Sequence, residues 1–238
     1  NKPEEVIDKL TSIKSPSLFT LKGENGVILY AIPCKGSDAE RQLILSKLKE
    51  MPWEIATIQL IGPFIEGLVN FNNVFSKIEA SHKTEIIKFL WTEHLKNKTM
   101  PHRASDDNEH SPSSFEDDFG DFVITNHLVP EQFIIYPLSS LHQKSELIFR
   151  FPGHKKKLLQ YISSKSSKIK NNKIKKIHFH PLLKMFIEEY IKECKRTESE
   201  LYIFSNKLPS KKPDVFLKEL ENFLAKNPNP YHYPADYI

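Results

Sequence analysis

Residues 18–32, Leu-Phe-Thr-Leu-Lys-Gly-Glu-Asn-Gly-Val-Ile-Leu-Tyr-Ala-Ile, carry the strongest local structural signal in the chain. An Asn-Gly pair between two apolar runs favours a tight turn, because both residues tolerate a positive φ angle. The stretch therefore predicts a β-hairpin with strands over 18–21 and 27–32 and a turn at 24–26. Pro33 is expected to end the second strand, since it cannot donate a main-chain hydrogen bond.

The segments on either side of the hairpin alternate between helical and strand patterns. Apolar residues at helical spacing, or alternating with polar ones, predict the element type. In the first half they predict helices over 3–14, 38–50, 63–78 and 84–95 and a strand over 56–61, with Ser37 or Asp38 capping the second helix. In the second half they predict strands over 121–124, 132–136, 146–151 and 201–204, and helices over 154–162, 181–194 and 214–225. Residues 163–173 are expected to form a loose polar segment. Antiparallel hairpins interleaved with helices predict an α+β fold.

A polar segment separates the two halves. Residues 96–116 contain Asn, Ser, Pro, Asp and His with almost no aliphatic side chains, which is typical of an exposed linker. We therefore expect an N-terminal α+β lobe (1–97), an acidic polar linker (98–118) and a C-terminal α+β lobe (119–238). A length of 238 residues is equally compatible with one large domain.

The composition favours a soluble intracellular protein. Hydrophobic residues make up 39% of the chain and the formal net charge is +4, which allows a sizeable core. The longest apolar stretch, 55–69, is interrupted by Gln59, Pro63 and Glu66 and is too short to span a bilayer. Cys34 and Cys194 are the only cysteines, too few for a secreted disulfide framework. We expect reduced thiols and a cytoplasmic or nuclear location.

A lysine-rich stretch is the first candidate for a functional site. Nine lysines and no acidic residue occupy positions 155–176. Such a cluster attracts polyanions, whether acidic proteins, anionic lipids or nucleic acid. A solvated surface without a partner explains the same pattern. The candidate anion-binding residues are Lys155, Lys156, Lys157, Lys173, Lys175 and Lys176.

The end of the linker is the second candidate. Phenylalanines embedded in acidic residues make a compact docking peptide, because the rings fill pockets while the carboxylates meet a basic rim. The candidate partner-binding residues are Phe115, Asp117, Asp118, Phe119 and Phe122. The segment Asp118-Phe119-Gly120-Asp121-Phe122 resembles the short acidic Phe-Gly peptides bound by the ear domains of clathrin adaptors. The alternative is that Phe119 and Phe122 enter the core of the following strand.

Signals for catalysis are sparse. His178 and His180 lie on one side of an extended segment, as in metal hydrolases, but the spacing supplies no third ligand. Only 7 glycines are present, and no glycine-rich phosphate loop or nucleophile elbow occurs, so no cofactor is expected. A metal-dependent hydrolase is therefore the third hypothesis.

The leading functional hypothesis is a non-catalytic scaffold or adaptor subunit of an intracellular assembly. It would bind other proteins through the acidic aromatic linker and the lysine-rich face. The alternative is a nucleic-acid-binding or nucleic-acid-processing protein that uses the same lysines.

Overall fold

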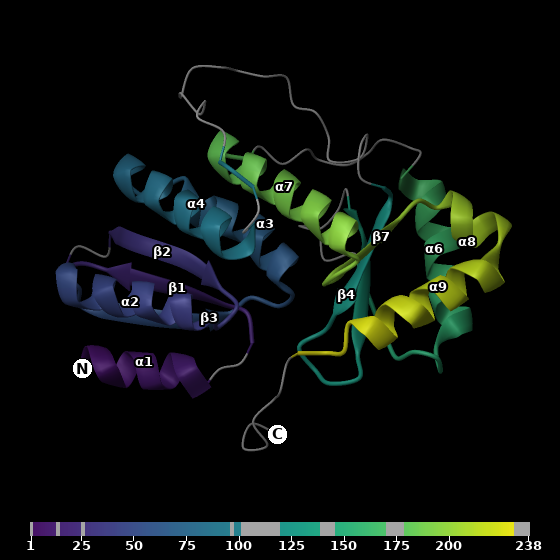
Figure 1. Ribbon diagram of the computed structural model, residues 1–238, viewed down its shortest axis with the longest axis horizontal. Helices are drawn as coiled ribbons and strands as arrows, with labels where there is room; N and C mark the ends of the chain where they lie inside the picture. Colours follow the sequence, from purple (N-terminus) through teal and green to yellow (C-terminus); the bar gives the residue numbers. More distant parts are fainter. Residues whose placement is uncertain are drawn as a thin grey trace. The chain divides into compact units, whose positions relative to one another are not determined.

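The computed structural model describes residues 2–12, 15–24, 27–95, 98–100, 120–138, 146–169 and 179–230, apart from the side chains of residues 168 and 169. These residues form eight helices and two antiparallel sheets of three and four strands (Figure 1). The predicted α+β fold is thereby confirmed. Two compact units are present, one containing residues up to 100 with 179–187, the other containing 120–169 with 188–230.

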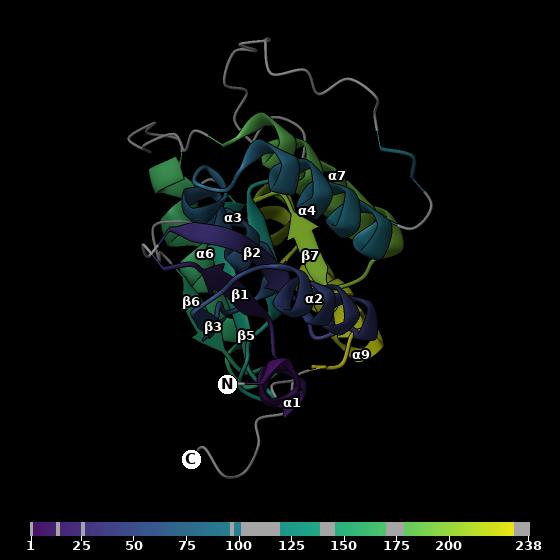
Figure 2. The same cartoon turned by 90° about the vertical axis from the view of Figure 1, so that its left-hand side faces the viewer.

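The first unit has the predicted order of helix, hairpin, helix, strand and two helices. Its elements are α1 (Pro3–Ser12), β1 (Ser17–Lys22), β2 (Ile28–Cys34), α2 (Asp38–Glu50), β3 (Ile55–Leu60), α3 (Phe64–Phe75) and α4 (Ala80–His94). The strands pair in the order β2-β1-β3, so α2 connects the two outer strands. Helix α1 packs beside α2 (Figures 1 and 2).

Pro33 does not end the second strand of the hairpin, contrary to the prediction. Strand β2 continues to Cys34, and Pro33 lies opposite Leu18 of β1. Because β2 is an outer strand, a residue without an N–H group can occupy it when its nitrogen faces away from the sheet.

The start of α2 shows why the sequence specified this helix well. Ser37 is the N-cap: its hydroxyl accepts the Glu40 N–H at 3.2 Å, and Glu40 returns a bond to the Ser37 N–H at 2.8 Å. This reciprocal capping box satisfies main-chain donors that a helix start otherwise leaves free.

The second unit is built on the sheet β6-β5-β4-β7. Its elements are β4 (Phe122–Asn126), β5 (Phe133–Pro137), β6 (Leu147–Phe149), α6 (Lys155–Ile169), β7 (Leu201–Phe204), α8 (Lys207–Lys211) and α9 (Pro213–Lys226). Helix α7 (Pro181–Thr197) contributes residues 181–187 to the first unit and 188–197 to the second.

Helix α6 is longer than predicted. It continues to Ile169, so residues 163–169 are helical rather than loose. Ser166 lies one turn after Ile162, is only 8% exposed and donates its hydroxyl to the Ile162 carbonyl at 2.6 Å. Packing of this face against the unit therefore outweighs the weak helix propensity of the serines.

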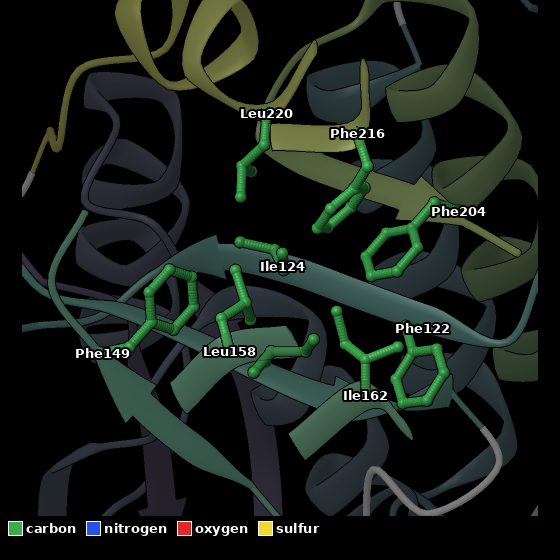
Figure 3. Close-up of a cluster of buried hydrophobic side chains, with 9 residues drawn as sticks. Phe122, Ile124, Phe149, Leu158, Ile162, Phe204, Phe216 and Leu220 are labelled. Atoms are coloured by element: carbon green, nitrogen blue, oxygen red, sulfur yellow. The ribbon is translucent and has the colours of Figure 1, made fainter. Parts of the chain in front are cut away.

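The core of the second unit lies between one face of the four-stranded sheet and two helices. Side chains from the strands meet those of α6 and α9 in one buried cluster (Figure 3). Its members are Phe122, Ile124, Ile135, Phe149, Leu158, Ile162, Phe204, Phe216 and Leu220. The rings of Phe122 and Phe204 stack with their centroids 5.6 Å apart.

Candidate interaction surface

The first turn of α6 carries three consecutive lysines. The turn before it is closed by hydrogen bonds between Arg150 and His154, from the His154 N–H to the Arg150 carbonyl at 3.0 Å and from the Arg150 N–H to His154 Nδ1 at 3.2 Å. Leu158 and Ile162 then place the apolar face of α6 in the core. Lys156 and Lys157 lie away from this face and are exposed.

The electrostatics of this turn are unfavourable for the helix itself. The N-terminal end of a helix carries partial positive charge. An acidic residue there stabilises the helix by about 0.3–1 kcal/mol, and a lysine is unfavourable by a similar amount. The first turn of α6 contains no acidic residue, and Lys155, Lys156 and Lys157 form no ion pair with any described residue. These charges are uncompensated within that part of the chain.

Lys155 differs from its two neighbours. Its ammonium lies 5.0 Å from the centroid of the Phe151 ring, a cation–π contact, and its side chain is half-buried. Substitution of Lys156 and Lys157 therefore tests a binding role without disturbing a contact within the described part of the chain.

Helix α8 and the residue after it carry further lysines, which were not among the predicted site residues. The helix packs against α6, and its Leu208 contacts the core cluster. Lys207, Lys211 and Lys212 are exposed and form no ion pair with described residues. The charge run was visible in the sequence, but its position beside α6 depends on the tertiary fold.

The remaining predicted lysines, Lys173, Lys175 and Lys176, lie outside the described residues. Their membership of one face with the α6 lysines stays a prediction.

The prediction that Phe122 is a docking residue is wrong. It is fully buried in β4, with its ring against Phe204 (Figure 3). The two preceding residues are also fixed by the fold: the Asp121 carboxylate accepts the Asn206 N–H at 2.7 Å, and Gly120 has a φ of +131°. A Cβ at Gly120 would lie 3.1 Å from the Phe204 carbonyl oxygen. The alternative that Phe122 enters the strand core is the one observed.

The other acidic-linker candidates, Phe115, Asp117, Asp118 and Phe119, lie outside the described residues. A docking role for this segment stays a prediction, now restricted to residues before Gly120.

The histidine pair provides no metal site within the described residues. His178 lies outside them, while the His180 ring meets Phe75 edge-on with centroids 5.0 Å apart. The His180 N–H donates to the Asn72 side-chain oxygen at 3.0 Å. No three His, Cys, Asp or Glu side chains in the described part of the chain are grouped so as to hold a metal ion.

A buried carboxylate in the first unit was not anticipated. Glu40 is inaccessible to solvent and accepts N–H groups from Lys35, Gly36 and Ser37 at 2.8–3.0 Å. His94 Nε2 lies 3.5 Å from its other oxygen. Burial alone would raise the pKa of Glu40, but His94 and the main-chain donors outweigh it and hold the pKa below the usual value. The signal was the Ser-x-x-Glu capping box; the contact with His94 required the fold.

The two cysteine thiols of the chain are both buried, and Cys34, close to Glu40, is unsuited to nucleophilic chemistry. Cys34 is fully buried, and burial followed by the charge of Glu40 raises the pKa of its thiol well above the usual range. A thiolate is the reactive form of cysteine, so this thiol is poorly nucleophilic. Cys194 is also buried, and no disulfide joins the two cysteines.

Within the ranges that the structure describes, no helix is long and apolar enough to cross a membrane.

Comparison with known proteins gives no relative: no family model, curated protein or solved structure matches the chain.

Proposed function

We propose that this chain is a non-catalytic interaction subunit of an intracellular assembly, and that the first turn of α6 binds an acidic segment of a partner protein. One observation carries the proposal: three consecutive lysines occupy a helix start that disfavours them, without an acidic neighbour in the turn. Charges that oppose the stability of their own helix are more readily explained by binding than by folding.

The acidic aromatic segment would supply the second contact. Phe115 and Phe119 remain the candidate docking rings, because Phe122 belongs to the core. Two contacts of opposite charge on one chain allow it to join two partners, which is the property of a scaffold or adaptor. The two buried cysteines, which form no disulfide, support a location in the reducing cytoplasm or nucleus.

Affinity capture with the intact chain tests the first contact. Lys156→Glu combined with Lys157→Glu should remove the acidic partner, because the substitution turns attraction into repulsion at exposed side chains. The matched control combines Lys77→Glu with Lys88→Glu, two exposed lysines of the first unit that undergo the same change in charge. The partner should be retained by this control.

The second contact needs its own variant. Phe115→Ala with Phe119→Ala should remove a different protein from the captured set while leaving the acidic partner bound. Identical partner lists for all variants and the unsubstituted chain would remove the proposal.

Nucleic acid is the second candidate partner, because a phosphate backbone satisfies the same uncompensated lysines. Random DNA and RNA should then be retarded in gel-shift experiments at low salt. Absence of a shift under those conditions would eliminate this candidate and leave the acidic protein.

A further inference from the structure

Strand β3 is an exposed outer strand of the first unit's sheet. Ile55 is 52% exposed and Leu60 is 45% exposed, values unusual for large apolar side chains within a strand. The whole strand, Ile-Ala-Thr-Ile-Gln-Leu, contains no charge and no proline. Outer strands are ordinarily protected by such residues, by bulges or by shortness, because their free main-chain groups can pair with another chain.

The other outer strands in the described residues carry such protection. Strand β2 contains Pro33 and is largely buried, while β6 and β7 are only three and four residues long. β3 alone among them is six residues long and uncharged, with Ile55, Thr57 and Gln59 exposed on one face and Leu60 exposed at the end of the other.

The main-chain groups that β3 leaves free can be assigned from its pairing with β1. The Ile61 N–H donates to the Pro16 carbonyl at 3.2 Å, and Leu60 lies opposite Ser17. In an antiparallel ladder, alternate residues direct their N–H and C=O groups to the same neighbour. Residues 55, 57 and 59 therefore face β1, and Ala56, Ile58 and Leu60 face outward.

These outward groups are complementary to a second copy of themselves. A two-fold axis perpendicular to the sheet at Ile58 sets Ile58 opposite the partner's Ile58 and Ala56 opposite the partner's Leu60. Every outward N–H and C=O group of Ala56, Ile58 and Leu60 then finds a partner.

The side chains match in the same register. On one face, the large Leu60 meets the small Ala56 of the partner subunit. On the other face, the exposed Ile55 meets the partner's Ile61. Within each chain, the Ile61 side chain packs against Gly67, where a Cβ would lie 2.2 Å from Ile61 Cδ1. Because the strand contains no charged residue, its pairing with a second copy brings no like charges of the strand together.

We propose that β3 pairs with β3 of a second copy of this chain, joining two three-stranded sheets into one antiparallel sheet of six strands. The paired edge is about 20 Å long and buries on the order of 500 Å² in total, less than stable dimers need. The dimer is accordingly weak and reversible.

Sedimentation equilibrium of the full chain over a concentration series up to about 1 mM tests the dimer directly. The unsubstituted chain should show a concentration-dependent rise toward twice the monomer mass. A chain that stays monomeric throughout would overturn the proposal and leave the edge to a strand from another protein or to another segment of this chain.

Substitutions at the two-fold axis test the register. Ile58→Lys brings two like charges together and should raise the dissociation constant more than tenfold; Ile58→Glu should do the same. Mixing the two variants should restore a heterodimer, which no mere folding defect would do. Circular dichroism of each variant verifies the fold, and failure of the mixture to associate while both variants are folded would overturn the register.

Cross-linking provides an independent measurement. Ile58→Cys should form an intermolecular disulfide under mild oxidation, because paired residues of this kind lie about 5.5 Å apart between Cα atoms. The native thiols of Cys34 and Cys194 are buried and do not compete. Gln59→Cys, one residue from the axis, is the matched control and should cross-link far less. Equal cross-linking by both variants would contradict the two-fold register.

Discussion

Glu40 is the residue whose chemistry the structure defines most sharply. Three successive main-chain N–H groups converge on its carboxylate, which is buried beside His94. The arrangement resembles an anion-binding nest occupied by the protein's own side chain. Its role is structural, because it fixes the connection between β2 and α2.

Glu40→Gln should lower the free energy of unfolding of the first unit by about 2–4 kcal/mol, because an amide leaves buried donors without a charged acceptor. Urea unfolding followed by tryptophan fluorescence measures this, since Trp53 and Trp91 both belong to the first unit. Glu50→Gln on the same helix is the control: Glu50 is exposed, and its ion pair with Lys47 should be worth less than about 0.5 kcal/mol. Equal losses for both variants would contradict a special role for Glu40.

The same residue predicts an acid-sensitive fold. The pKa of Glu40 is lowered in the folded state. Its carboxylate therefore stabilises the fold when the pH is above 4.5, the usual pKa of this group, and the contribution disappears as pH falls through the lowered pKa. The difference in unfolding free energy between the unsubstituted chain and Glu40→Gln should be fully present above pH 4.5 and shrink as pH falls through the lowered pKa. A difference that grows on acidification would contradict the assignment.

At the scale of elements, α6 separates what stabilises the fold from what is available for binding. Its apolar face, with Leu158 and Ile162, supplies part of the second unit's core, whereas Lys156 and Lys157 in its first turn are exposed and make no ion pair with a described residue. Binding and stability should therefore respond in opposite directions to the same substitution.

Lys156→Glu with Lys157→Glu should raise the stability of the second unit by about 0.5–1.5 kcal/mol, because acidic side chains suit a helix N-terminus. Thermal unfolding followed by far-ultraviolet circular dichroism measures the change. Lys226→Glu in the last turn of α9 is the opposite control and should be destabilising, because it reverses a favourable charge and breaks the 3.0 Å ion pair with Glu198. A clear loss of stability for the α6 variant would make its lysines structural.

The elements also show where sequence patterns succeed. The extent of α2 was predicted to the residue because its cap, Ser37 with Glu40, is a local interaction. The end of α6 was missed because residues 163–169 are serine- and lysine-rich, and their helical state depends on packing of the Ser166 face. Local rules cannot report such a contact.

At the scale of the whole molecule, the formal charge of +4 is too small to explain selective binding of a polyanion. The α6 substitution and the Lys77→Glu, Lys88→Glu control each bring the net charge from +4 to zero, because each Lys→Glu exchange lowers the net charge by two. They differ only in which surface changes.

Salt dependence should distinguish the two surfaces. Partner retention by the unsubstituted chain and by the control should fall as sodium chloride rises from about 50 to 300 mM, because the Debye length shortens to several ångströms. Residual retention by the α6 variant should be insensitive to salt. Equal salt dependence for the control and the α6 variant would show that net charge, rather than the α6 surface, governs binding.

By itself, the sequence determined the α+β class, the antiparallel pairing of β1 with β2, the capped start of α2 and the apolar faces of the helices, because these follow from interactions between residues close in the chain. Only the tertiary structure decided that Phe122 is core, that α8 adds its lysines beside α6, that Glu40 meets His94, and that β3 is an outer strand. Each of these depends on contacts between residues far apart in sequence, which periodicity and local propensity do not encode.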